Sequence, residues 1–214
     1  MKKTLLAGLA TGLLIAGMTS SANAASINYG TGPTLGSIVY DFDSNAVGAL
    51  SGTYNLGSLG SITSTTNSII SNTSNGDGAE PAGDITNYLS VKGGGSTTIT
   101  LSNPNNYSFG LLWGSMDTYN TITFTFLNGT SESFTGTDVA SSPGANGSWY
   151  DASQNKYVDF IFSNAINTVT FSSGSNSFEI DNISVSPVPE PATMLLFGTG
   201  IAGLAGMVRR RKMN

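Results

Sequence analysis

The sequence predicts an all-β fold, an antiparallel β-sandwich of the jelly-roll type, for residues 25–186. Glycine, serine, threonine and asparagine separate short apolar segments, and no helical apolar period persists beyond two turns in this region. Polar and apolar residues alternate instead, which is typical of strands with one buried and one solvated face. This region is long enough for a single domain with a sizeable core.

The clearest strand covers residues 121–126, where threonines alternate with isoleucine and phenylalanine. Asn128 and Gly129 follow it and precede a second run, 130–135, so we expect a hairpin with a type I′ turn. In chain order, further strands are expected at residues 37–42, 62–66, 88–92, 97–101, 107–113, 157–162, 167–172 and 178–185. Loops are expected at 43–60, 72–86 and 136–155, and a turn at the glycine run 93–95.

The last of these strands contains an irregularity. Phe178 and Ile180 share one face, whereas Ile183 and Val185 are one residue out of phase with them. A bulge at 181–182 would return both pairs to the core and re-aim Asp181. The alternative is a strand that ends at Ile180 and restarts.

The chain begins with the pattern of a secretory signal peptide. Two lysines precede an uncharged, mostly apolar run over residues 4–18, and small residues then lead to Ala22 and Ala24. Only small side chains fit signal peptidase three residues and one residue before the cut. We therefore expect residues 1–24 to be removed, with an uncleaved N-terminal anchor as the alternative.

A second apolar run, residues 192–208, is uncharged and precedes a basic tail formed by Arg209, Arg210, Arg211 and Lys212. As a helix it would extend about 26 Å, slightly less than the roughly 30 Å of a bilayer core, so it can just span a membrane. Four adjacent cations stop transfer because their passage through the bilayer is costly. Residues 25–190 are therefore expected outside the membrane.

Pro189, Glu190 and Pro191 stand directly before this run. The prolines keep the backbone extended, which gives a membrane-embedded protease a segment to bind. The order of Pro-Glu-Pro, glycine-rich apolar helix and basic tail in residues 187–214 resembles the PEP-CTERM sorting signal. The resemblance implies a Gram-negative bacterium that makes exopolysaccharide, transient anchoring in the inner membrane, and cleavage by exosortase near Pro-Glu-Pro. An ordinary tail anchor is the alternative.

Composition narrows the possible chemistry. Without the two signals the chain keeps two basic and twelve acidic residues, a formal charge of −10, which disfavours nucleic acid and anionic lipid and favours divalent cations. The same acidity can serve solubility alone. No cysteine and no histidine are present, which excludes thiolate chemistry, imidazole zinc sites and the Ser-His-Asp triad.

The glycine-rich loop 75–84 offers Asp77, Glu80 and Asp84 as ligands for calcium, a cation that prefers carboxylate and carbonyl oxygens. The loop lacks EF-hand spacing, and a solvated acidic loop is the alternative.

Asp41, Asp43 and Asp181 form a competing set. The Phe-Asp pair of the early strand and the Phe-x-Ile-Asp-Asn-Ile run of the last strand resemble those of extracellular jelly rolls, including carbohydrate-binding modules. The resemblance implies that the two strands are neighbours and that a calcium ion ties them together.

Aromatic residues are candidates for glycan binding because flat sugar faces pack on aromatic rings. Trp149 and Tyr150 lie in a polar loop and are the better exposed pair, whereas Trp113 ends an apolar run and is expected in the core.

Three functions remain open. We expect a non-enzymatic surface or matrix protein, processed by signal peptidase and exosortase and associated with exopolysaccharide in a structural or adhesive role. The alternatives are a calcium-stabilised carbohydrate-binding module and a glycoside hydrolase that relies on two carboxylates.

Overall fold

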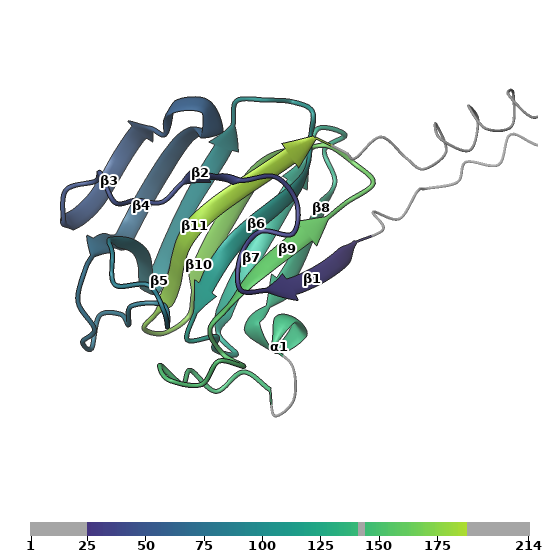
Figure 1. Ribbon diagram of the computed structural model, residues 1–214. Coiled ribbons are helices and arrows are strands. Elements are labelled where there is room, and N and C mark those ends of the chain that lie inside the picture. The colour runs from purple at the N-terminus through teal and green to yellow at the C-terminus, as the bar shows by residue number, and fades with distance from the viewer. Residues whose placement is uncertain (1–24, 141–143, 188–214) are drawn as a thin grey trace, which may run out of the picture.

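The structure is a computed structural model that describes residues 25–140 and 144–187, and it confirms the all-β, antiparallel class (Figure 1). Helical structure within these residues is limited to the 3-10 turn Gly57–Leu59 and the short helix α1 (Gly136–Val139). The strands, in chain order, are β1 (Ser26–Gly30), β2 (Ile38–Tyr40), β3 (Gly48–Asn55), β4 (Gly60–Ser71), β5 (Tyr88–Leu101), β6 (Asn106–Gly114), β7 (Asn120–Phe126), β8 (Ser131–Thr135), β9 (Lys156–Ile161), β10 (Ile166–Ser173) and β11 (Phe178–Pro187).

The strands form one antiparallel sheet that curls into two packed layers. Its main path runs β1-β9-β6-β11-β5-β10-β7-β8, with β2 beside β11, β4 beside β5, and β3 beyond β4. The β9-β6-β11 layer packs on the β10-β7-β8 layer. Phe109 of β6 lies with its ring centroid 6.0 Å from Phe124 of β7 and 6.2 Å from Phe171 of β10. The predicted β-sandwich is confirmed, and the curl of one sheet produces it.

Strand β5 is the corner of this curl. Along one edge, residues 89–91 pair with β11 and residues 96–100 pair with β10. The predicted turn at residues 93–95 is wrong, because the strand continues through the three glycines. A Cβ atom on Gly95 would lie 2.8 Å from two backbone carbonyl oxygens, so only glycine fits this bend.

Strands β7 and β8 form the predicted hairpin, although the turn is not type I′. The Phe126 N–H donates to the Thr130 carbonyl and the Gly129 N–H donates to the Phe126 carbonyl, both at 2.9 Å. Gly129 has a φ of +83°, whereas Asn128 has no positive φ. Asn128 instead accepts the Thr130 N–H on its Oδ1 at 3.0 Å. The turn therefore has a negative φ at Asn128 and ends at Gly129, whose backbone is in the left-handed region.

Aromatic side chains fill the space between the layers. Phe124 lies 5.0 Å from Phe160 and 4.7 Å from Phe162, measured between ring centroids. Towards the other end of the strands, Trp113 stacks on Phe178 at 4.3 Å and is fully buried, as expected for a core residue. Such pairs contribute about 0.5–1.5 kcal/mol each beyond the burial of their surface.

The predicted bulge in β11 is present. The pairing of β11 with β6 shifts register between Asp181 and Ser184, and Asn182 has a φ of +51°. Ile180 and Ile183, on either side of the bulge, are both fully buried. Because Asp181 alternates with Ile180, it lies on the outer face of the layer.

Two strands lie where none was expected. β1 pairs with β9 along its whole length, and β3, inside the predicted loop 43–60, pairs with β4. Leu50 is the one buried residue of β3. An edge strand that buries so little lacks the alternation on which sequence-based strand prediction depends.

Both ends of the described domain lie at the same end of the sandwich. Ser26 of β1 pairs with Ile161 of β9, Ile161 pairs with Ser108 of β6, and Ser108 pairs with Ser186 of β11. The four residues therefore form one row across the layer.

Candidate functional site

Four loops, 72–87, 115–119, 144–155 and 174–177, come together at the other end of these strands and line the cavities described below. Each of them enters or leaves a strand of the sandwich, so the rigid sheet fixes their spacing.

Asn155 ties three of these loops together, and only 7% of it is exposed. Its Oδ1 accepts the backbone N–H groups of Ala82 at 3.1 Å and Ser115 at 2.9 Å. Its Nδ2 donates to the carbonyls of Ser148 at 2.8 Å and Asp151 at 3.1 Å. All four hydrogen-bonding positions of the amide are thus used.

Trp149 and Tyr150 lie between the two carbonyls that Asn155 holds. Trp149 is 39% exposed and Tyr150 is 90% exposed, unlike the buried aromatic core. Both line a cavity of about 280 Å³, which we call the aromatic cavity. Its remaining lining residues are Ser74, Glu80, Pro81, Ala82, Gly83, Asp84 and Ile85.

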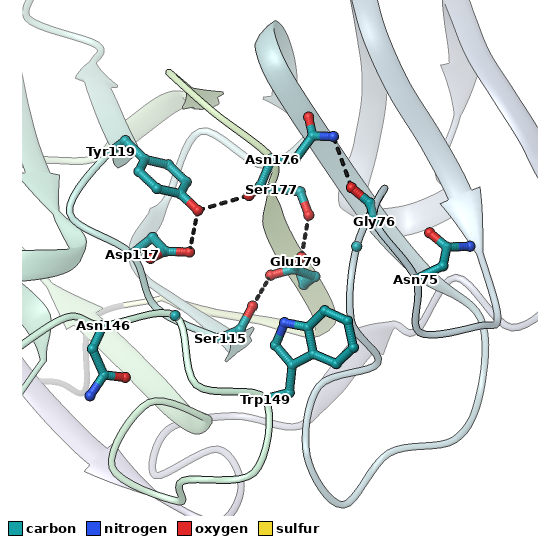
Figure 2. Close-up of a pocket in the computed structure, with 12 residues that line it drawn as sticks. Asn75, Gly76, Ser115, Asp117, Tyr119, Asn146, Trp149, Asn176, Ser177 and Glu179 are labelled. Atoms are coloured by element: carbon teal, nitrogen blue, oxygen red, sulfur yellow. Dashed lines mark hydrogen bonds between the residues drawn. The ribbon is translucent and has the colours of Figure 1, made fainter.

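Trp149 also lines a second cavity, of about 210 Å³, which we call the polar cavity (Figure 2). The indole lies beside Glu179 in this view, with Asp117 and Tyr119 on the far wall. The other lining residues are Asn75, Gly76, Gly78, Ser115, Asn146, Gly147, Asn176 and Ser177. Trp149 therefore belongs to the walls of both cavities.

Glu179 forms the floor of the polar cavity and is only 1% exposed. Its Oε1 accepts from the Ser177 hydroxyl and from the Ala79 N–H at 3.2 Å, and its Oε2 accepts from the Ser115 hydroxyl at 2.5 Å. Burial raises the pKa of the Glu179 carboxyl to about 7, although these three hydrogen bonds favour the charged form. None of the described residues that line this cavity is positively charged.

Asp117 and Tyr119 form the far wall. The Tyr119 hydroxyl lies 2.6 Å from Asp117 Oδ2 and 2.7 Å from the Asn176 carbonyl oxygen. Partial burial raises the pKa of the Asp117 carboxyl, and the hydrogen bond from Tyr119 opposes that rise. Gly147 packs directly on this carboxylate, because a Cβ there would lie 2.5 Å from Oδ1.

The bulge of β11 brings together one member of each predicted calcium set, Asp84 and Asp181. Asn182 links them: its backbone N–H donates to Asp181 Oδ1 at 2.7 Å and its amide donates to Asp84 Oδ2 at 2.6 Å. Asp181 Oδ2 is buried and has no hydrogen-bond partner. Burial, followed by the negative charges of Asp84 and Asp43, raises the pKa of Asp181 to about 8.

Of the other predicted calcium ligands, Asp43 lies near enough for its charge to act on Asp181, whereas Asp77, Glu80 and Asp41 make other contacts. Asp77 forms an ion pair with Lys92 at 3.2 Å, and Glu80 lines the aromatic cavity. Asp41 is exposed, and its Oδ1 accepts the Asp43 N–H at 3.3 Å. Over residues 25–140 and 144–187, no three acids gather closely enough to hold a metal ion.

Glu179 and Asp117 were not predicted as site residues. In β11, Glu179 alternates with Phe178 and Ile180, a pattern that places its carboxylate on the outer, solvated face. Loop 72–87 buries it instead. The sequence signal was the presence of two acids in so apolar a strand.

The predicted sorting residues lie outside the described part of the chain. They are Ala22 and Ala24 of the signal peptide, Pro189, Glu190 and Pro191, the run 192–208, and Arg209, Arg210, Arg211 and Lys212. In the part that is described, no helix is both long and apolar enough to cross a membrane.

Two solved structures are similar to this chain in part. One is the isomalto-dextranase of Arthrobacter globiformis T6 in complex with panose, with 15% identity, a TM-score of 0.36, and coverage of 77% of this chain and 32% of that protein. The other is CtCBM11, studied in solution for structure, dynamics and binding, with 11% identity, a TM-score of 0.19, and coverage of 70% and 96%. This chain thus spans about one third of the isomalto-dextranase.

No curated protein matches the sequence significantly. Residues 187–212 match the model of the PEP-CTERM protein-sorting motif, which includes the predicted Pro-Glu-Pro, apolar run and basic tail. The chain therefore carries a PEP-CTERM sorting signal, which directs exosortase-dependent export to the cell surface.

Proposed function

We propose that the mature domain is a non-catalytic surface or extracellular-matrix protein that retains exopolysaccharide through Trp149 and Tyr150. Signal peptidase removes residues 1–24, the run 192–208 anchors the chain transiently in the inner membrane of a Gram-negative bacterium, and exosortase cuts near Pro-Glu-Pro. The exposure of two adjacent aromatic residues on a loop that Asn155 holds in place carries the proposal.

The chemistry of the aromatic cavity fits a polysaccharide. Trp149 and Tyr150 offer apolar ring faces, on which the C–H face of a sugar can pack. Glu80 and Asp84 lie beside them as hydrogen-bond acceptors for sugar hydroxyls. Since Asn155 fixes the loop on both sides, little order has to be created when a glycan binds.

The hydrogen bonds of Glu179 favour binding over glycoside hydrolysis. A general acid needs a free oxygen that faces the leaving group. Both oxygens of Glu179 already accept hydrogen bonds from Ser115, Ser177 and Ala79, and the carboxyl is almost wholly buried. Its raised pKa therefore follows from a structural position in the floor of the cavity.

The experiment compares the exported wild-type protein with the double variant Trp149→Ala/Tyr150→Ala in affinity electrophoresis through the exopolysaccharide of the producing bacterium. We expect the double variant to lose at least tenfold in affinity. Tyr54→Ala on β3 removes a ring that is 41% exposed and lies outside both cavities, so it should bind as the wild type does. Equal retention of the wild type and the double variant would overturn the proposal.

A second proposal is that a calcium ion stabilises the bulge between Asp84 and Asp181. The buried Oδ2 of Asp181 lacks a donor and lies near another carboxylate, so either a proton or a cation must offset the repulsion. Calcium is suited to this place because it accepts carboxylate oxygens in flexible geometry and can complete its six to eight ligands with backbone carbonyls and water, although no third acid of the described residues joins the pair.

Thermal unfolding of the exported protein tests this second proposal. Millimolar calcium should raise the Tm of the wild type by several degrees relative to EDTA. A calcium concentration of a hundred times the Kd would stabilise the folded state by about 2.7 kcal/mol. Asp181→Asn should remove this response, while Asp77→Asn, in the predicted loop but paired with Lys92, should keep it. If calcium does not change the Tm of the wild type, the calcium proposal is wrong, and a bound proton offsets the repulsion between Asp84 and Asp181.

A further inference from the structure

We infer that the polar cavity beside Trp149 binds a sugar residue that carries a protonated amine, with Asp117 as its counter-ion. This inference rests on the proposed glycan binding and names the class of sugar. The aromatic cavity offers a stacking surface, and the polar cavity on the other side of Trp149 offers a charged one.

The charge of the polar cavity favours a cation. Asp117 and Glu179 are the acids in its lining, and among the described residues no lysine or arginine contributes to it. Asp117 supplies the negative charge below pH 7, where Glu179 is mostly protonated. The two lysines of the described domain lie elsewhere: Lys92 pairs with Asp77, and Lys156 Nζ lies 5.1 Å from the centroid of the Tyr29 ring. A uronate or sulfated sugar would therefore meet like charge without a compensating cation.

On the far wall of the cavity, two acceptors share one donor. Tyr119 has one hydroxyl proton but lies within hydrogen-bonding distance of two acceptors, Asp117 Oδ2 and the Asn176 carbonyl. Asn176 Nδ2 donates one of its two hydrogens to the Gly76 carbonyl at 2.9 Å, on the side away from Tyr119 in Figure 2. Asp117 Oδ1 receives no donor from the described residues.

An ammonium group meets this need better than a hydroxyl does, since it carries three donors and a positive charge. The ammonium also gains the attraction between opposite full charges, which a neutral hydroxyl lacks. Gly147, which packs on the carboxylate, shields one side of Asp117 from water. Trp149 provides the wall against which the sugar ring would lie, so the amine and the ring are recognised together.

Isothermal titration of the exported protein at pH 6 tests the inference with three sets of oligosaccharides of equal length. Glucosamine oligosaccharides carry the protonated amine, N-acetylglucosamine oligosaccharides carry the same ring without the charge, and galacturonate oligosaccharides carry a negative charge. We expect the wild type to bind the glucosamine form at least tenfold more tightly than the acetylated form, and the galacturonate form least tightly of the three.

Asp117→Asn should lower the affinity for the glucosamine form to that for the acetylated form and leave the latter unchanged. Glu132→Gln removes one acid from β8, outside both cavities, and should preserve the wild-type preference. Equal binding of the glucosamine and acetylated forms by the wild type would overturn the inference, as would a preference that survives Asp117→Asn.

The two proposals fail separately. If exopolysaccharide retention depends on Trp149 and Tyr150 but the amine has no effect, the proposed function stands and this inference is wrong. If no oligosaccharide and no exopolysaccharide binds, both are wrong.

Discussion

The polar side chains on the two outer faces of the sandwich find their hydrogen-bond partners in different ways. On the β10-β7-β8 side, the hydroxyls of Thr123 and Thr125 pair in solvent with serine hydroxyls of β8, at 2.8 and 3.1 Å. We call this the hydroxyl face. On the β9-β6-β11 side, Asp159, Glu179 and Asp181 point outward from the sheet and are nevertheless at most 1% exposed. We call this the acid face.

The comparison teaches where binding chemistry can arise in such a fold. On the hydroxyl face, the strands alone satisfy the polar side chains, because these groups bind water or a hydroxyl of the next strand. The acid face is covered by distant chain segments: Thr34 donates to Asp159 at 2.6 Å through its hydroxyl, and Ala79 donates to Glu179. Residues of loop 72–87, which covers part of the acid face, line both cavities.

The largest effect is expected in the core beneath the hydroxyl face. Phe124→Ala should lower the free energy of unfolding by about 3–5 kcal/mol, because Phe124 is fully buried among other phenylalanine rings. Thr123→Ala, one residue away on the solvated side, should cost less than about 0.5 kcal/mol. Urea unfolding measures both values. A similar loss of free energy of unfolding in both variants would contradict the alternation of buried and solvated residues along β7.

Asn155→Asp should have the next largest effect and should act on the acid face alone. The carboxylate can still accept from Ala82 and Ser115 but can no longer donate to Ser148 and Asp151. We expect a loss of about 2 kcal/mol in urea unfolding and weaker binding of exopolysaccharide.

The matched control for this change is Asn128→Asp. The Asn128 side chain only accepts in the β7-β8 turn, from the Thr130 N–H and hydroxyl, and Asp can do the same. It should be close to neutral, and a loss as large as that of Asn155→Asp would contradict the argument.

The third prediction concerns pH. The pKa of Glu179 is raised from an ordinary 4.5 to about 7, so the folded state binds this proton more tightly than the unfolded chain does. The stability from that proton is fully present below about pH 4.5 and is lost as the pH rises through about 7. Between these two pH values, the free energy of unfolding should fall by on the order of 1 kcal/mol per pH unit.

Glu179→Gln should remove this part of the pH dependence, because the amide keeps an acceptor for Ala79 and Ser177 and does not ionise. Asp181 titrates in both proteins, so the difference between the two curves isolates Glu179. Thermal unfolding from pH 4 to pH 8 measures it. Parallel curves would mean that Glu179 has an ordinary pKa.

The smallest effect is expected at the rim of the acid face. Lys92 Nζ lies 3.2 Å from Asp77 Oδ1, but the two side chains are 27% and 51% exposed. Exposed ion pairs contribute little, so Lys92→Met should change the free energy of unfolding by less than about 0.5 kcal/mol. A loss comparable to that of Asn155→Asp would show that the ion pair, rather than the buried amide, fixes loop 72–87.

Sequence reasoning succeeded where local patterns determine structure. The alternation in β7, the bulge in β11 and the core position of Trp113 follow from which residues can share a face, and the structure confirms all three. It failed at β3, which buries only Leu50, and at the glycine run, where the backbone bends without ending the strand.

The site depends on contacts that are distant in sequence. Asp84 and Asp181 were predicted in separate calcium sets, and Asn182 links them only because loop 72–87 folds over β11. Glu179 and Asp117 line one cavity because β6, which leads into loop 115–119, pairs with β11. Periodicity indicates which residues point outward, but it does not indicate which loop will cover them.

The row formed by Ser26, Ile161, Ser108 and Ser186 determines how the domain is presented. Gly114, where the cavity end begins, lies six residues along β6 from Ser108, which is about 20 Å of strand. Under the proposed anchoring through residues 192–208, this row would face the envelope and Trp149 would lie on the far side. The sandwich would then act as a rigid spacer that lets polymer reach the loops before the proposed exosortase cut.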